Sequence, residues 1–265
     1  MRVRLTFIDR SRRPHEIREL SVSIFFEGEF SSAYEQGDNS RVLPTDTMKN
    51  TVYVLARQLE WDSIEVFGRQ IAQHFLVRLR HASQVSVHIE QVPWHAIAGH
   101  ASAFVKMDNE RRTTRVVATR ESIDIHSGLA GLHIMKTADS AFSGFLKDEF
   151  TTLAETEDRL FGTVLEAEWQ YVPGRDIDFN DAHCTVRQIL LDTFAQHQSL
   201  SVQHTLFAMG EAVLDAAPQI GEIHLVMPNK HCLLVDLARF GLDNPNQIFV
   251  PIDEPSGYIE ARLKR

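Results

Sequence analysis

Four polar side chains with different chemistry stand close together in the segment 44–55, PTDTMKNTVYVL. Thr45 supplies a hydroxyl, Asp46 a carboxylate, Lys49 an amine and Asn50 an amide, and an apolar, β-prone run follows them. Polar groups at the end of a strand are held by a rigid scaffold, so they can take part in binding or proton transfer. A Thr-Asp pair at such a point is more often a turn or a helix cap, so the segment alone indicates no particular reaction.

Three further blocks follow in order along the chain. They are SAFSGFLKDEFTTL (140–153) continued by ETEDR (155–159), LVMPNKH (225–231), and NPN (244–246) with PSGYIEA (255–261). Together with the first segment, these blocks resemble the signatures of the urate oxidase (uricase) family along nearly the whole chain. The resemblance implies a cofactor-independent enzyme of purine breakdown, which oxidises urate with O2 and water to 5-hydroxyisourate and hydrogen peroxide.

Urate is a planar purine and an anion at neutral pH, so its site needs a forked cation, an amide and a flat apolar surface. The resemblance assigns the fork to Arg159, the amide on the ring edge to Gln203 and the stacking surface to Phe142. Val202 offers its backbone and closes the wall. Taken singly, Arg159 is more often a surface ion-pair partner, Gln203 a solvent-facing helix residue and Phe142 a core ring.

Ground-state O2 reacts slowly with closed-shell organic molecules, and enzymes usually recruit a metal or a flavin for it. Removing a second proton from urate makes the substrate itself reducing enough to donate an electron. The family relay is a lysine, a threonine and a histidine, and the resemblance matches the threonine to Thr45 and the histidine to His231. It matches Asn229 to the residue that holds oxygen or water above the ring. Asp46 matches one that contacts the substrate through its backbone from the neighbouring subunit. By itself, His231 is more often a structural histidine.

The sequence contains no recognisable set of metal ligands. His95 and His100 are five residues apart and His197 and His204 seven apart, but no carboxylate or cysteine completes either pair. No glycine fingerprint for a dinucleotide or a phosphate occurs. We therefore expect neither a metal nor a cofactor.

The lysine of the family relay has no counterpart here. It lies in a Tyr-Gly-Lys segment just upstream of the first strand, which in this chain would fall before Met1. Three explanations are open. The given sequence starts late, the protein is truly short and catalytically weakened, or the α-amine of Met1 partly replaces the lysine. That amine has a pKa of about 8, against about 10.4 for lysine, but a frayed terminus is poorly preorganised, which favours the late start. Without the lysine we expect nearly normal urate binding and much slower turnover.

Two other functions fit parts of the pattern. A non-catalytic urate or purine binding protein would keep the clamp but have a broken relay. A pterin-converting relative on the same fold would anchor its ligand through a carboxylate and would often use zinc. Arg159 with Gln203 suits the carbonyl-rich edge of urate better.

Hydrophobic periodicity predicts the elements that must position these groups. Strands are expected at 3–8, 20–26, 50–58, 84–91, 114–125, 132–136, 163–171, 222–227 and 232–237. A helix is expected from Asp62, with Asp62 and Glu65 as a capping box, and two more at 181–197 and 201–216. This order predicts two copies of one α+β unit, residues 1–130 and 131–265.

Antiparallel strands with helices on one face leave open sheet edges, which natural proteins cover or pair. The family resemblance implies the tunnelling fold (T-fold), with two tandem units per chain. Their antiparallel sheets would close into barrels between the subunits of a homotetramer, with active sites at the subunit interfaces.

The composition of the chain limits the kinds of molecule that the protein can bind. A formal net charge of −9 argues against nucleic acid, and it means that an anionic substrate needs a local cation. No apolar run approaches the roughly 18–20 residues of a membrane helix. The first residues are no secretory signal, the last three are no peroxisomal address, and two cysteines make no disulfide framework. These features predict a cytoplasmic protein with no membrane contact.

Overall fold

A computed structural model describes residues 1–107 and 109–265, which form two compact units. Unit 1 comprises Met1–Leu129 and Gln170–His183, and unit 2 comprises Ala130–Trp169 and Cys184–Arg265. The contacts thus divide the chain near residue 130 and add one later segment to the first unit.

An antiparallel sheet is the frame of unit 1. Its strands follow the order β1 (Arg2–Asp9), β2 (Glu16–Gly28), β3 (Ala82–Val92), β6 (Arg111–Thr119) and β7 (Ile123–Lys136), whose last part belongs to unit 2. In β3, Val85, Val87 and Ile89 are buried and alternate with less buried polar residues, the pattern of a sheet with one covered face. Short β4 (Trp94–Ala96) and β5 (Phe104–Lys106) pair only with each other among the described strands. The strands predicted at 3–8, 20–26 and 84–91 are confirmed.

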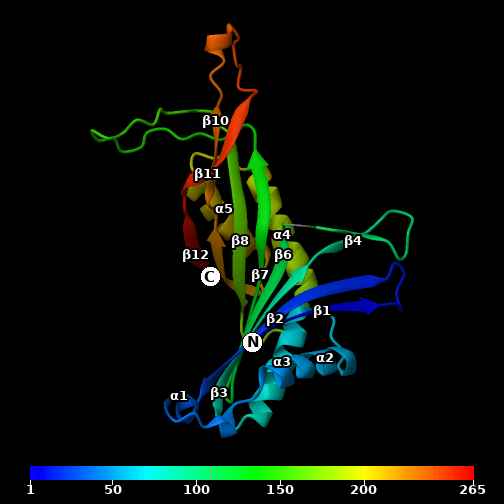
Figure 1. The fold of residues 1–265 in the computed structure, drawn as a ribbon. Coiled ribbons are helices and arrows are strands. Elements are labelled where there is room, and N and C mark those ends of the chain that lie inside the picture. Colours follow the sequence, from blue (N-terminus) through cyan, green and yellow to red (C-terminus); the bar gives the residue numbers. More distant parts are fainter. Residues whose placement is uncertain (108) are drawn as a thin grey trace. The chain divides into compact units, whose positions relative to one another are not determined.

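Helices supply the other half of the core of unit 1. Helix α3 (Ile64–Arg78) packs against β3 and β6 (Figure 1), and it buries Phe67, Ile71 and Phe75 at the predicted four-residue spacing. Helix α2 (Thr45–Gln58) contacts β1 and α3. The short α1 (Ser31–Glu35) and the 3-10 turn η1 (Asn39–Arg41) precede it.

The strand predicted at 50–58 is wrong, because these residues belong to α2. Met48, Val52 and Leu55 are buried at helical spacing, and this face packs into the core of unit 1. The β-branched and aromatic residues that follow Thr51 suggested a strand, but burial of one helical face outweighs their propensity. Thr45 and Asp46 therefore begin a helix and do not lie at the mouth of a strand.

Two other predicted features of unit 1 are corrected. The N-cap of α3 is Ser63, whose hydroxyl accepts from the Val66 amide at 3.3 Å, so Asp62 and Glu65 form no capping box. The strand predicted at 114–125 is two strands, because β6 ends at Thr119 and β7 begins at Ile123. The hydroxyl of Thr119 accepts from the amide of Ser122 at 3.0 Å and closes the turn between them.

Unit 2 repeats the combination of antiparallel strands and helices. Here β8 (Phe161–Tyr171) is paired by β9 (Ile220–Val226) and β10 (Asn229–Leu234), which are separated by Met227-Pro228. Strand β11 (Phe249–Gly257) pairs with β10, and β12 (Glu260–Lys264) pairs with β9. Helix α5 (Val202–Ala216) packs on β9 and β12 and follows α4 (Phe179–Gln196); η2 (Ala238–Phe240) interrupts the β10–β11 connection.

In unit 2 the helices predicted at 181–197 and 201–216 and the strands at 163–171 and 222–227 are confirmed within a few residues. The strand predicted at 232–237 begins earlier, at Asn229, and β11 and β12 were not predicted at all. Phe249–Gly257 contains two prolines and several charges, so it lacks the alternation that marks a half-buried strand.

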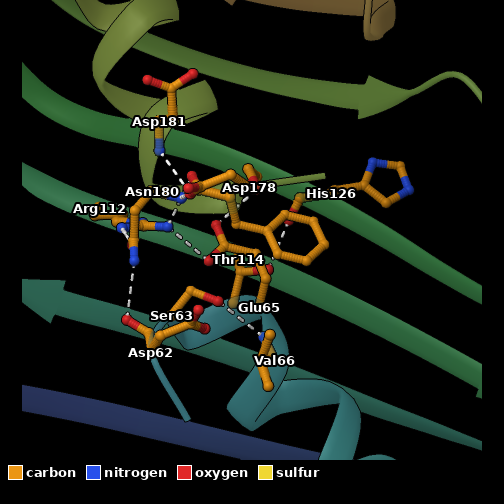
Figure 2. A network of polar contacts seen from close by, with 12 residues as sticks. Asp62, Ser63, Glu65, Val66, Arg112, Thr114, His126, Asp178, Asn180 and Asp181 are labelled. Atoms are coloured by element: carbon orange, nitrogen blue, oxygen red, sulfur yellow. Dashed lines mark hydrogen bonds and ion pairs between the residues drawn. The ribbon is translucent and has the colours of Figure 1, made fainter. Parts of the chain in front are cut away.

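A buried polar network ties α3, the sheet and the start of α4 together within unit 1 (Figure 2). The Glu65 side chain is fully buried and accepts from Arg112 Nη2 at 2.8 Å and from the Ser127 hydroxyl at 2.6 Å. Arg112 Nη1 donates to Asn180 Oδ1 at 2.6 Å, and the Tyr171 hydroxyl donates to Ser127 Oγ at 2.7 Å. The charge of Glu65 is thus met by a guanidinium and a hydroxyl inside the protein.

Two further observations concern the sequence predictions. No helix in the described parts of the chain is long and apolar enough to span a membrane.

The nitrogen of Met1 donates to the Ile24 carbonyl at 2.8 Å. This hydrogen bond extends the pairing of β1 with β2 by one residue.

Candidate active site

Unit 2 contains a cavity of about 390 Å³, large enough for a small heterocycle. All the residues that line it belong to this unit. Six of the eight residues predicted from the sequence line it: Phe142, Arg159, Val202, Gln203, Asn229 and His231. They lie 89 residues apart at the extremes, so only the fold brings them together.

Phe142 and Arg159 are held side by side by backbone hydrogen bonds. The amide of Phe142 donates to the Thr156 carbonyl at 2.8 Å, and the amide of Arg159 donates to the Ser140 carbonyl at 2.8 Å. The Arg159 guanidinium carbon lies 5.6 Å from the centre of the Phe142 ring and 5.6 Å from that of Phe161. The two segments therefore present a cation and an aromatic face to the same space.

Arg159 is the only arginine or lysine among the described residues that line the cavity. Burial lowers the pKa of its guanidinium, which still remains protonated, since arginine titrates far above neutral pH. Its Nε is buried and has no hydrogen-bond partner among the described residues. A half-buried guanidinium with an unused, buried donor favours an anionic or carbonyl-rich ligand.

Val202 and Gln203 are the first two residues of α5. The N-cap Ser201 accepts from the His204 amide at 3.1 Å, and the Ala141 amide donates to the Ser199 carbonyl at 2.7 Å. These bonds fix the start of α5 beside the segment that carries Phe142. Helix N-termini present amides without intrahelical partners and a partial positive charge, so this wall also suits an anion.

Asn229 and His231 stand two residues apart on β10, and both line the cavity. The pairing of β10 with β11 shifts between them: Asn229 faces Gly257, whereas His231 faces Ile252. Residues two apart on a strand point to the same face, and this irregularity does not separate the two polar side chains, since both line the cavity.

The remaining two predicted residues belong to unit 1. Thr45 and Asp46 begin α2 and are exposed. The Asp46 carboxylate accepts from Lys49 Nζ at 2.5 Å and from Asn50 Nδ2 at 2.9 Å, and the hydrogen bond with Lys49 lowers its pKa. The carboxylate is therefore engaged within its own helix, which leaves the backbone of Asp46 for other contacts.

No group of three or more His, Cys, Asp or Glu residues that could hold a metal ion occurs in the described residues. His197 and His204 do come together, with ring centres 4.3 Å apart, and His197 Nδ1 lies 3.2 Å from the Thr205 hydroxyl.

The sequence analysis did not single out the apolar residues of the cavity wall. Leu153, Leu233, Phe249 and Ile259 line the cavity. The period-two continuation of Asn229 and His231 along β10 could have indicated Leu233. Nothing in the local pattern indicates Leu153 or Phe249, which reach the site through long loops.

Gly257 gives a testable expectation for this geometry. A Cβ added at Gly257 would lie 3.3 Å from Ile259 Cδ1 and 3.7 Å from Asn229 Cβ. The contact to Asn229 is an ordinary one, but Ile259, which lines the cavity, must move by a few tenths of an ångström. We expect Gly257→Ala to lower kcat by about tenfold, since small misplacements at a reacting centre are costly. Steady-state turnover assays measure the effect. Ser256→Ala, at the exposed neighbouring position of β11, is the control for a small change in the same strand.

Together, the fold and the cavity define an α+β protein with a small-molecule site suited to a flat, anionic heterocycle.

The uricase family model matches residues 3–117 and 125–260. The uricase of Arthrobacter globiformis is 39% identical over 263 residues, which cover 99% of this chain and 86% of the relative. The uricase of Oryctolagus cuniculus is 37% identical over 273 residues, covering 99% of this chain and 91% of the relative. The crystal structure of the Arthrobacter globiformis uricase matches with a TM-score of 0.94 over 99% of this chain and 91% of that chain. The chain belongs to the uricase family.

Proposed function

We propose that this protein is a urate oxidase that converts urate, O2 and water into 5-hydroxyisourate and hydrogen peroxide. The observation that carries the proposal is the meeting of Phe142, Arg159, Gln203, Asn229 and His231 in one cavity of unit 2. These residues supply the stacking face, the cation, the ring-edge amide and the polar groups above the ring that the reaction needs.

Substrate binding follows from the shape and charge of urate. Arg159 and Gln203 hold the carbonyl-rich edge of the purine, and Phe142 stacks on its face. The backbone of Val202, at the positive end of α5, adds a donor to the anion. Fixing the ring in one orientation leaves its opposite face to O2 and water.

The chemistry is a two-electron oxidation of the purine. Urate gives up two electrons and O2 accepts them, so that O2 leaves as hydrogen peroxide with two protons, while water supplies the new hydroxyl group of 5-hydroxyisourate. Removal of a second proton from urate starts the transfer, and we assign the relay to Thr45 and His231. Asn229 holds oxygen or water above the ring. No metal or cofactor takes part in the proposed reaction.

We further propose that the protein works as a homotetramer in the cytoplasm, with Thr45 and the backbone of Asp46 reaching the cavity from a neighbouring subunit. Apolar side chains on the β10–β11 hairpin support association, since Leu233, Leu234 and Val250 are each about half exposed. The outer strand β1 of unit 1 offers an unpaired edge of the kind that barrels close. Sedimentation velocity of the purified protein tests the tetramer.

The decisive test of the reaction is urate consumption at its absorbance band with parallel measurement of O2 and peroxide, on protein dialysed against a chelator. The same assay is run on the chain preceded by a Tyr-Gly-Lys segment, and urate binding is measured without O2. We expect one peroxide released per urate consumed, and faster turnover in the extended protein. If neither protein consumes urate, the proposed activity is wrong, and anaerobic binding then shows whether a binding function remains.

His231 gives a second test of the relay. We expect His231→Gln to lower kcat by about 100-fold, because an amide can hydrogen-bond but cannot carry a proton at neutral pH. Its anaerobic affinity for urate should stay within about threefold, since binding rests on Arg159 and Gln203. Equal losses in affinity and turnover would instead make His231 a binding residue.

A further inference from the structure

Asn229 lies at the centre of a row of residues that crosses three strands. On one side its partner is Thr163 in β8, and on the other its partner is Gly257 in β11. Side chains directly opposite each other in an antiparallel pair point to the same face of the sheet. The only polar side chain beside Asn229 in this row is therefore that of Thr163.

Both members of the Thr163–Asn229 pair have an unused polar atom. The Thr163 side chain is almost completely buried, at 3% exposure. Neither Thr163 Oγ1 nor Asn229 Oδ1 has a hydrogen-bond partner within the described part of the chain. Two orphaned polar atoms in one buried place are rare in native proteins, because each would lose its hydration without compensation.

One water molecule between the two atoms would satisfy both of them. Opposed residues hold their Cβ atoms about 4.5–5.5 Å apart, yet the two oxygens make no direct hydrogen bond, so one water in contact with both would satisfy them. On the other side of Asn229, Gly257 has no side chain that could compete for either atom. A buried water typically makes about three hydrogen bonds to groups that would otherwise be unsatisfied.

We propose that Thr163 is a positioning residue for oxygen activation, which fixes the Asn229 amide through one buried water. The water binds Asn229 Oδ1 on the protein side, so that Nδ2 points into the cavity as a donor. A donor above the ring holds O2 and stabilises the negative charge that O2 acquires when urate reduces it. Thr163 touches neither urate nor O2 and acts only through the amide. The proposal rests on the proposed urate oxidase function for the role of Asn229.

The test compares Thr163→Val, Thr163→Ser, Asn229→Ala and the double variant Thr163→Val/Asn229→Ala. Valine keeps the shape and the strand preference of threonine without its hydroxyl, whereas serine keeps the hydroxyl. Anaerobic affinity for urate, kcat, KM for O2 and Tm are measured for each. Thr113→Val in β6, a half-buried threonine of unit 1, controls for the loss of a hydroxyl elsewhere in a strand.

We expect Thr163→Val to lower kcat/KM for O2 by about tenfold and to leave anaerobic urate affinity within about threefold, while serine recovers most of the loss. In the Asn229→Ala background, Thr163→Val should change turnover by less than about twofold, because its effect passes through the missing amide. Three results would overturn the proposal: losses that multiply in the double variant, serine no better than valine, or wild-type turnover with a raised Tm for valine. The last would mean that the hydroxyl is truly unpartnered and only destabilises the fold.

A crystal structure of the wild-type protein without ligand separates this proposal from the proposed function. A water within hydrogen-bond distance of both Thr163 Oγ1 and Asn229 Oδ1 supports the positioning role even if the protein oxidises no urate. Two side chains packed together without such a water overturn it even if the protein is a rapid urate oxidase.

Discussion

Arg159→Ala is expected to lower kcat/KM for urate by about 10³-fold. A hydrogen bond to a charged partner is worth about 1.5–3 kcal/mol, and loss of two of them from a forked contact corresponds to this factor. The stacking face of Phe142 remains, so residual binding is through the ring alone. Initial rates over a range of urate concentrations, with anaerobic titration of urate, measure the effect.

Arg159→Lys is the informative companion, because it keeps the charge and loses the planar fork. We expect it to recover less than a tenth of the lost kcat/KM, since an ammonium group cannot make two parallel bonds to the ring edge. Arg78→Ala in α3 is the control for removing an exposed arginine, and it should leave kcat/KM unchanged. If lysine fully replaces arginine, Arg159 contributes charge only and the proposed clamp is wrong.

Arg112→Ala is expected to destabilise the protein by about 3–5 kcal/mol, the range for breaking a buried ion pair from one side. It removes the 2.8 Å contact to Glu65 and the 2.6 Å contact to Asn180, and it leaves a fully buried carboxylate without its cation. The network in Figure 2 joins α3 to the start of α4, so loss of Arg112 loosens the packing of 170–183 on the rest of unit 1. Thermal and urea unfolding measure the change.

The destabilisation by Arg112→Ala should depend on pH. Burial is the largest influence on the pKa of Glu65 and raises it above its ordinary value of 4.5, while Arg112 works in the opposite direction. A carboxyl group with a raised folded-state pKa favours folding below its unfolded pKa, and this contribution is lost as the pH rises through the folded pKa. Without Arg112 that pKa rises further. We therefore expect the variant to be weakest relative to wild type at pH 8 and the difference to shrink toward pH 5.

A double variant and a control variant test this prediction. Glu65→Gln combined with Arg112→Ala should remove most of the pH dependence, because no buried carboxyl remains to ionise. Arg2→Ala breaks an ion pair with Glu90 whose side chains are 64% and 52% exposed, and it should cost less than about 1 kcal/mol. A loss for Arg112→Ala that is equally small, or one that grows toward low pH, would contradict the assigned role of the Glu65–Arg112 pair.

Three segments show when the local sequence pattern predicts the secondary structure and when it does not. In β3, alternation over 84–91 reports a sheet face directly, because the side-chain period of a strand is two whatever lies beyond it. In α2, the run after Thr51 is rich in β-branched residues and still folds as a helix, since burial of Met48, Val52 and Leu55 on one face decides the outcome. Strand β11 was not predicted because it is paired mainly through its backbone and keeps little apolar pattern of its own.

The sequence by itself determined the family resemblance, the α+β class and the identity of six residues that line the cavity. It could do so because ordered blocks of unusual residues and hydrophobic periods are properties of the chain alone. Only the tertiary structure decided that Phe142, Arg159, Gln203, Asn229 and His231 share a cavity in unit 2, while Thr45 and Asp46 begin a helix in unit 1. The row Thr163–Asn229–Gly257 likewise depends on strand register, and register is set by pairings between residues far apart in sequence, which no local pattern contains.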